Sequence, residues 1–173
     1  MPDNAISALE GTSMSGPTDS ARSFDLSPPT AEQRRTLEAK LTREERDVLL
    51  NHGTERPFCG TLLDNKKSGV YCCKLCGLPL FAANEKFESG TGWPSFTAPF
   101  DPKHLATVRD TTYGMVRTEI RCARCGSHQG HVFPDGPPPT HERYCINSVS
   151  LEFVATGDKL PDKLGRGEAS VPA

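Results

Sequence analysis

Residues 71–81 read Tyr-Cys-Cys-Lys-Leu-Cys-Gly-Leu-Pro-Leu-Phe, and residues 122–126 repeat part of that pattern as Cys-Ala-Arg-Cys-Gly. Each stretch contains two cysteines separated by two residues and followed by a glycine. In a tight turn this spacing places both thiolates against one tetrahedral metal ion, and the glycine lets the backbone turn beside the sulfurs. The two pairs predict one closed structural zinc site per chain, with the ligands Cys73, Cys76, Cys122 and Cys125.

Cys72 competes with Cys73 for the first ligand position. Pairing Cys72 with Cys76 would leave three residues between the thiols, which does not match the second pair, and neighbours on a strand point to opposite faces. Two redox-active pairs are another interpretation, but a thioredoxin-like motif opens a helix in a βαβ pattern, which the sequence does not indicate. Because a closed four-thiolate site leaves no open coordination position, we expect the metal to stabilise the fold. Iron in place of zinc, and a degenerate site, are the remaining alternatives.

The composition excludes several classes of protein. The chain has 173 residues and seven cysteines, an odd number that cannot all pair in disulfides. Its net charge of −2 gives no basic footprint for nucleic acid or an anionic membrane. The sequence contains neither a run of about 18 apolar residues nor a basic segment followed by an apolar signal region. We therefore expect a cytoplasmic monomer with reduced thiols and no nucleic-acid or membrane partner.

The chain divides into three parts by composition. Residues 1–29 are rich in serine and proline and too polar to bury a core, so a disordered tail is expected. Residues 155–173 are expected to form a polar C-terminal tail. Residues 30–154 contain all seven cysteines and are expected to form one folded domain.

This domain is expected to open with two short helices. Thr30 with Gln33, and Thr42 with Glu45, fit the capping-box pattern at a helix N-terminus, and Gly53 fits the residue that ends the second helix. Past residue 58 the sequence changes to short alternating runs between turn residues. The expected strands are residues 70–72, 78–81, 115–121 and 143–154. The fold class is therefore mainly β, with antiparallel sheets in a barrel-like or sandwich core and a short N-terminal helical arm.

Cys145 has the richest chemical surroundings of the remaining cysteines. On a strand, Arg143, Cys145 and Asn147 would share one face, and the guanidinium would lower the pKa of the thiol. A buried strand cysteine without a chemical role is the alternative. His128 and His131 follow the second cysteine pair in a stretch that we expect to be an irregular loop. With four thiolates already available, they are freer to donate protons than to bind metal.

Trp93 lies in Ser-Gly-Thr-Gly-Trp-Pro-Ser-Phe, residues 89–96, which predicts a stiff exposed turn. The indole is suited to forming a wall for an apolar ligand, or alternatively to capping the core. Asp135 begins Asp-Gly-Pro-Pro-Pro, which predicts a rigid loop.

Taken in order, YCCKLCGLPLF, SGTGWPSF, RCARCGSHQGHVF and RYCINS resemble the methionine-R-sulfoxide reductase family, MsrB, over about residues 35–154. The resemblance implies an MsrB-like fold with a zinc site, in which Cys145 is the nucleophile and Trp93 packs on the substrate methyl group. It places His128, His131 and Asn147 around the sulfoxide oxygen, and Arg143 and Asp135 at further matching motif positions.

The implied reaction reduces methionine-R-sulfoxide, protein-bound and possibly free, and leaves a sulfenic acid on Cys145. A second cysteine would then form a disulfide that an external dithiol such as thioredoxin reduces. Many members carry this cysteine where the chain has Thr91. Cys59, in a loop in which Gly60 gives mobility, is the preferred substitute; Cys72 and direct reduction are the alternatives. A non-catalytic zinc module for partner recognition is the rival function, and a zinc hydrolase with histidine ligands is disfavoured by the four thiolates.

Overall fold

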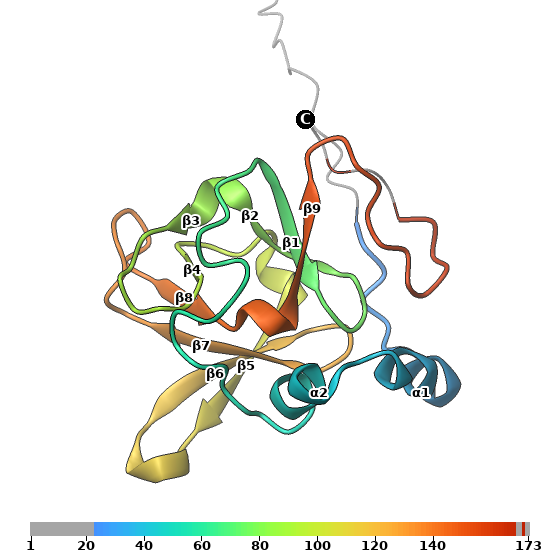
Figure 1. Ribbon diagram of the computed structural model, residues 1–173, viewed down its shortest axis with the longest axis horizontal. Helices are drawn as coiled ribbons and strands as arrows, with labels where there is room; N and C mark the ends of the chain where they lie inside the picture. The colour runs from blue at the N-terminus through green and yellow to red at the C-terminus, as the bar shows by residue number, and fades with distance from the viewer. Residues whose placement is uncertain (1–22, 169–170, 172–173) are drawn as a thin grey trace, which may run out of the picture.

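The computed structural model describes residues 23–168 and residue 171 (Figure 1). Within these residues two short helices, α1 (Ala31–Ala39) and α2 (Arg43–Leu49), precede nine strands. The strands are β1 (Gly69–Cys73), β2 (Pro79–Ala82), β3 (Lys86–Phe87), β4 (Ser95–Phe96), β5 (Leu105–Asp110), β6 (Arg117–Cys122), β7 (His128–Phe133), β8 (Arg143–Ile146) and β9 (Leu151–Ala155). The predicted mainly-β fold with an N-terminal helical arm is confirmed.

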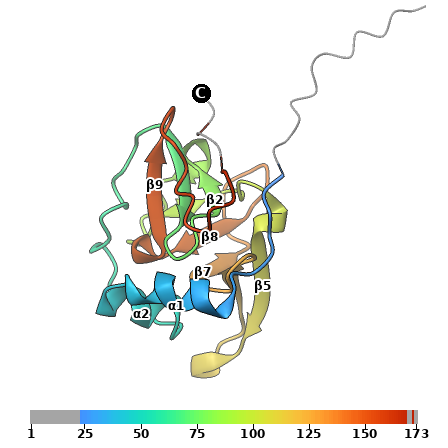
Figure 2. The same ribbon diagram turned by 90° about the vertical axis from the view of Figure 1, so that its right-hand side faces the viewer.

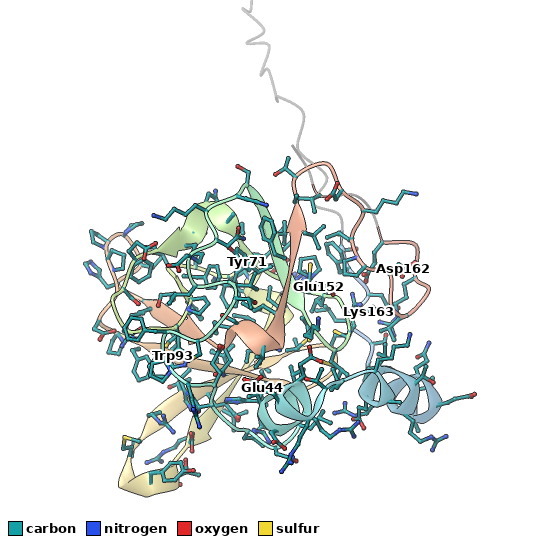
Figure 3. All side chains as sticks on the ribbon, viewed as in Figure 1. Glu44, Tyr71, Trp93, Glu152, Asp162 and Lys163 are labelled. Atoms are coloured by element: carbon teal, nitrogen blue, oxygen red, sulfur yellow. The ribbon has the colours of Figure 1, made fainter. Side chains whose placement is uncertain are left out.

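The strands form two antiparallel sheets that pack as a sandwich. One sheet has the order β2-β1-β9, and the other is open, with the order β3-β4-β8-β7-β6-β5. Aromatic rings from both sheets meet between them: Phe81 stacks on Phe96 with ring centroids 4.4 Å apart, and Tyr71 meets Phe96 edge to face at 5.1 Å. Figure 3 shows Tyr71 in this interior. Such pairs add to the hydrophobic burial that holds the two sheets together.

The larger sheet carries its apolar and its reactive side chains on opposite faces. Ile120 on β6 and Ile146 on β8 are buried in the core. Because side chains alternate along a strand, Cys145, which directly precedes Ile146 on β8, points to the other face of the sheet. In the sheet register Cys145 is opposite His131, and His131 is opposite Glu119. This outer face, which α2 partly covers at β7, therefore gathers the polar groups of three strands.

A bulge in β7 puts two histidines on that outer face. Ile120 and Arg121 are consecutive in β6, but their partners are Gly130 and His128, so Gln129 is the extra residue. Without the bulge, His128 and His131 would point to opposite faces of the strand. Their rings instead lie 5.6 Å apart. The predicted irregular loop at these residues is wrong, because they belong to a bulged strand.

Both predicted helix starts are confirmed as capping boxes. The Thr30 hydroxyl accepts from the backbone N–H of Gln33, and the Thr42 hydroxyl accepts from that of Glu45. The prediction that Gly53 directly follows the second helix is wrong: α2 ends with Leu50 as its cap, and His52 takes the left-handed conformation, with φ 58°. The helices lie along one end of the molecule (Figure 2). No helix in the described part of the chain has the length and apolarity needed to cross a membrane.

The strand predictions need two corrections. The run 143–154 is two strands, because the 3-10 turn Ser148–Ser150 separates β8 from β9 and sends them to different sheets. The run predicted from residue 115 becomes β6 only at Arg117, after the single 3-10 turn Thr112–Gly114 that joins it to β5. Further 3-10 turns occupy Ala83–Glu85 and Pro102–His104.

Packing extends beyond residues 30–154 at both ends. Residues 1–22 of the expected N-terminal tail lie outside the described part, but the Phe24 ring packs edge-on against Phe100, with centroids 6.1 Å apart. On the C-terminal side Leu160 and Leu164 are buried. An ion pair of 2.8 Å between Lys163 and Glu152 ties this segment to β9 (Figure 3). A few apolar residues are enough to anchor segments whose average composition is polar.

Candidate active site and metal centre

The two cysteine pairs form matching turns. In the first, the N–H of Gly77 donates to the carbonyl of Cys73 at 2.8 Å; in the second, the N–H of Gly126 donates to that of Cys122 at 2.8 Å. Both glycines have a positive φ, 82° and 74°, which side chains rarely tolerate. Both turns therefore need the glycine that follows each cysteine pair, as the sequence predicts.

The four sulfurs converge at one buried point. Cys73 and Cys125 have their Sγ atoms 3.6 Å apart, as do Cys76 and Cys122. These distances are far from the disulfide bond of about 2.05 Å. They are close to the separation of about 3.8 Å that four thiolates take around zinc at about 2.3 Å. The donor set therefore fits a tetrahedral metal ion.

Neighbouring groups complete the environment of the four thiols. The Ser127 hydroxyl lies 3.2 Å from the sulfur of Cys73 and 3.1 Å from that of Cys125. Arg124, inside the second turn, is almost fully buried and donates to the carbonyl of Cys76 and to the carboxylate of Glu168. The sequence does not predict the contact between Arg124 and Glu168, because Glu168 lies in residues 155–173, whose composition predicts a polar tail.

The second candidate site is a small cavity of about 100 Å³ over the outer face of the larger sheet. Four of the predicted site residues line it: Trp93, His131, Cys145 and Asn147. Thr54, Arg117, Gly130 and Phe133 complete the lining. Figure 3 shows Trp93 beside this sheet. A half-buried thiol thus shares one cavity with an aromatic ring, an imidazole and an amide.

The environment of Cys145 affects its pKa in both directions. Burial raises the pKa of the thiol, and this outweighs the lowering by the Arg143 guanidinium and the hydroxyl of Thr91. The predicted influence of Arg143 is present, but the expected net lowering of the pKa is wrong. The hydroxyl of Thr91 lies beside the thiol, so the position at which the resemblance implies a second cysteine is next to Cys145.

His131 is held by a carboxylate that the motifs do not reveal. Its Nε2 lies 2.8 Å from Oδ2 of Asp110, which also accepts from Arg117 at 3.2 Å. Bonds from the Thr112 side chain and backbone, then from His131, hold the pKa of Asp110 well below its usual range. An ionised carboxylate only accepts hydrogen bonds, so Nε2 of His131 carries the proton.

His128 lies outside the cavity lining, deeper beneath α2. Its side chain is 2% exposed, and Nδ1 lies 3.4 Å from Oε2 of Glu119. Burial lowers the pKa of His128 to about 4, so the ring is neutral near neutral pH. The structure thus separates the two histidines: His131 faces the thiol cavity, and His128 faces Glu119.

Arg143 and Asp135 pair with each other at the edge of the site. The guanidinium donates two hydrogen bonds to the carboxylate, at 2.9 and 3.0 Å, and stacks over Phe133 with its Cζ 4.5 Å from the ring centroid. Phe133, a cavity-lining residue, was not among those predicted from the sequence. The pair holds this ring in place as a wall of the cavity.

The backbone of Glu55 holds two of the predicted site residues. Its N–H donates to Oδ1 of Asn147 at 3.0 Å, and its carbonyl accepts from the Trp93 indole at 3.0 Å. Trp93 is therefore partly buried and fixed, so the turn predicted to be exposed is exposed only in part. The Glu55 carboxyl is itself buried, and that burial raises its pKa to about 7.

The two cysteines considered for a second redox role differ in access. Cys59 is exposed and lines a hollow between α2 and the segment 53–59. Thr54 lines both this hollow and the Cys145 cavity, so the two adjoin. Cys72 is fully buried, and burial raises the pKa of its thiol. Gly60 is not a free hinge, because a Cβ there would lie 2.1 Å from the Ser148 hydroxyl.

Comparison with known proteins agrees with this arrangement. A family model described as the SelR domain matches residues 41–155. A peptide methionine sulfoxide reductase MsrB of Caulobacter vibrioides is 68% identical over 151 residues, covering 87% of this chain and 95% of that protein. The MsrB of Xylella fastidiosa strain M23 is 63% identical over 145 residues, covering 84% and 94%. That of Escherichia coli O45:K1 is 51% identical over 126 residues, covering 73% and 90%. The chain belongs to the SelR-domain family of MsrB proteins.

Proposed function

We propose that the protein reduces methionine-R-sulfoxide to methionine, with Cys145 as the nucleophile. The observation that carries the proposal is the single cavity shared by Cys145, His131, Asn147 and Trp93, which come from three separate segments of the chain. A thiol beside a proton donor and an apolar wall suits a small polar sulfoxide that carries a methyl group. The rival function, a non-catalytic zinc module, is not favoured by membership of a family of reductases.

The chemical step balances without a further cofactor. The Cys145 thiolate attacks the sulfoxide sulfur, and a proton passes to the sulfoxide oxygen. The substrate S–O bond and the transient bond between the two sulfurs then break as the hydroxyl passes to the Cys145 sulfur. Methionine leaves with its sulfur reduced by two electrons, and Cys145 becomes a sulfenic acid, oxidised by two electrons. His131 is the proposed proton donor, since Asp110 orients its ring through a hydrogen bond to Nε2.

The remaining cavity residues orient the substrate. Trp93 and Phe133 present apolar ring surfaces suited to the methyl group, and Asn147 offers its amide to the sulfoxide oxygen. The Arg143–Asp135 pair keeps Phe133 in position. We assign His128 a supporting role behind His131, at a ring distance of 5.6 Å. The substrate class is methionine-R-sulfoxide in peptides or proteins.

The oxidised Cys145 is recycled through Cys59. Thr91 cannot form a disulfide, and Cys72 is too buried to be reached, whereas Cys59 is exposed on the neighbouring segment. The two free thiols line different hollows, so we expect the segment 53–59 to move when they form a disulfide, which needs Cα atoms within about 7 Å. A dithiol protein of the thioredoxin class would then reduce the exposed disulfide, which suits a monomer in the reducing cytoplasm.

Zinc is the metal proposed for the four-cysteine site. Cys73, Cys76, Cys122 and Cys125 would hold one ion per chain, and the ion would supply cross-linking of the two turns. Since Cys125 and His128 are close in sequence, this cross-link fixes the start of β7 and, through it, the histidine pair. Residues 30–154 are the proposed catalytic domain.

The direct test is reduction of a racemic methionine-sulfoxide peptide with dithiothreitol as reductant. Wild-type protein should convert only the R epimer, and Cys145→Ser should be inactive. Cys59→Ser is the matched control, because an external dithiol can reduce the sulfenic acid without a second protein thiol. Full activity in Cys145→Ser would contradict the proposal.

A further inference from the structure

A second group of metal-ligating side chains lies beside the reaction cavity and apart from the four cysteines. His52 follows α2, Glu119 is on β6 and His128 is on β7; each offers one ligand atom, and these atoms all lie within 4.8 Å of one another. The proposed reaction requires no metal at this place. Two imidazoles and one carboxylate are a donor set that zinc and similar divalent ions accept.

The spacing of the donors suits one small ion. Nδ1 of His52 lies 3.2 Å from Oε2 of Glu119, and Nδ1 of His128 lies 3.4 Å from the same oxygen. Ligands at about 2.0–2.1 Å from a tetrahedral ion are about 3.3–3.4 Å apart. Both nitrogens therefore already stand at that distance from the carboxylate oxygen, and they lie within 4.8 Å of each other.

His128 supplies an independent indication of a ligand. Its side chain is 2% exposed, and within the described residues neither ring nitrogen has a hydrogen-bond partner. The contact of Nδ1 with Glu119, at 3.4 Å, lacks hydrogen-bond geometry. Buried ring nitrogens are normally bonded, so this imidazole is aimed at Glu119 with an unused lone pair.

The cluster is open to solvent on one side only. The His52 side chain is 48% exposed, while that of Glu119 is 6% exposed, so an ion would arrive past His52. Arg121 also contacts Glu119, and its Nε donates to Oε1 at 2.8 Å and to Oε2, the oxygen that faces both histidines, at 2.9 Å. Its positive charge opposes a nearby cation, so binding should be weaker here than among four thiolates and freely exchangeable.

We propose that His52, Glu119 and His128 form an exchangeable site for a divalent transition-metal ion of the zinc class. Occupancy would hold His128 against Glu119 and place a positive charge near His131, whose ring lies 5.6 Å from that of His128. An ion there should slow sulfoxide reduction, and this consequence alone rests on the proposed function. The site would thus make the enzyme sensitive to free zinc.

The test titrates Co²⁺ into protein whose four-cysteine site is already filled with Zn²⁺. One additional ion should bind, with the visible d–d absorption of nitrogen and oxygen ligands and without thiolate charge-transfer absorption. His52→Asn should weaken this binding by more than about tenfold, since even outer-shell changes typically cost that much. Asparagine tolerates the left-handed backbone of His52, so the fold is retained.

His141→Asn is the matched control, because His141 is also exposed and has φ 56°. It should leave the additional ion in place. Absence of an additional ion, equal binding by His52→Asn, or thiolate charge-transfer absorption that disappears in Cys145→Ser would each overturn the site. Zn²⁺ should inhibit wild type and His141→Asn, but not His52→Asn. Bound metal in a protein without reductase activity would instead overturn the proposed function and leave the site standing.

Discussion

At His131 a single carboxylate decides which ring nitrogen carries a proton. Asp110 stays ionised because hydrogen bonds from Thr112 and His131 lower its pKa, and it therefore accepts from Nε2 of His131. The other ring nitrogen is left for the substrate. This is the arrangement by which a carboxylate holds a histidine in one orientation and one tautomer.

Replacing Asp110 should impair catalysis more than binding. Asp110→Asn keeps the shape of the side chain but removes the charge, so kcat should fall by about 10²-fold or more while KM changes little. Asp158→Asn, on the exposed surface, is the control. An unchanged kcat in Asp110→Asn would contradict the role of Asp110.

The thiol of Cys145 offers a pH test of its own. Burial raises its pKa and Arg143 lowers it, so Arg143→Gln should raise the pKa further. Peptide mapping can measure the rate at which iodoacetamide alkylates Cys145 at each pH. In the variant this rate should begin to rise at a higher pH than in wild type. Arg109→Gln, an exposed arginine, should match wild type. A shift toward lower pH would show that the guanidinium does not favour the thiolate.

Among the elements, the segment 53–60 affects both cysteines of the proposed redox cycle, because it contains Cys59 and holds residues that line the Cys145 cavity. Glu55 holds Asn147 and Trp93 through its backbone, and Cys59 is exposed a short distance along the chain. Its position depends on close packing, since Gly60 lies against the Ser148 hydroxyl and the Glu55 carboxyl. Movement of this segment would therefore loosen the cavity as it delivers Cys59.

The buried Glu55 carboxyl makes the stability of the protein depend on pH. Its pKa is about 7 in the folded state against an ordinary value of 4.5, so the folded state holds the proton more tightly. The resulting stability is complete below pH 4.5 and is lost as pH rises through about 7. The loss is on the order of 3 kcal/mol.

Glu55→Gln should remove this contribution to the pH dependence. Its free energy of unfolding in urea should fall less between pH 4.5 and pH 7 than that of wild type. Glu88→Gln, at an exposed site, should retain the wild-type slope. Equal slopes in all three proteins would show that Glu55 titrates normally.

Across the whole molecule, the sequence predicted those features that depend only on residues a few positions apart. The capping boxes at Thr30 and Thr42 and the two cysteine turns depend on residues within a few positions, and they are present as predicted. The bulge at Gln129 was not predictable, because it is defined by pairing with β6. The contacts of Asp110 and Glu55 likewise join segments far apart in the sequence.

The four-cysteine site should decide whether the whole chain folds. Structural zinc supplies about 10–16 kcal/mol, which equals or exceeds the usual net stability of about 5–15 kcal/mol. Cys125→Ser should therefore lose its metal, measured by elemental analysis, together with its cooperative thermal transition. Cys59→Ser should keep one zinc per chain and a wild-type Tm. A cooperatively folded, metal-free Cys125→Ser would contradict a structural role for the ion.

The central claim, that Cys145 takes the oxygen from the sulfoxide, is tested most directly by a single turnover without reductant. Cys59→Ser is mixed with a racemic methionine-sulfoxide peptide and dimedone, and the protein is mapped by mass spectrometry. We expect one methionine per chain, drawn from the R epimer only, and one dimedone adduct on Cys145. Methionine formed without that adduct, or an adduct on another cysteine, would contradict the account.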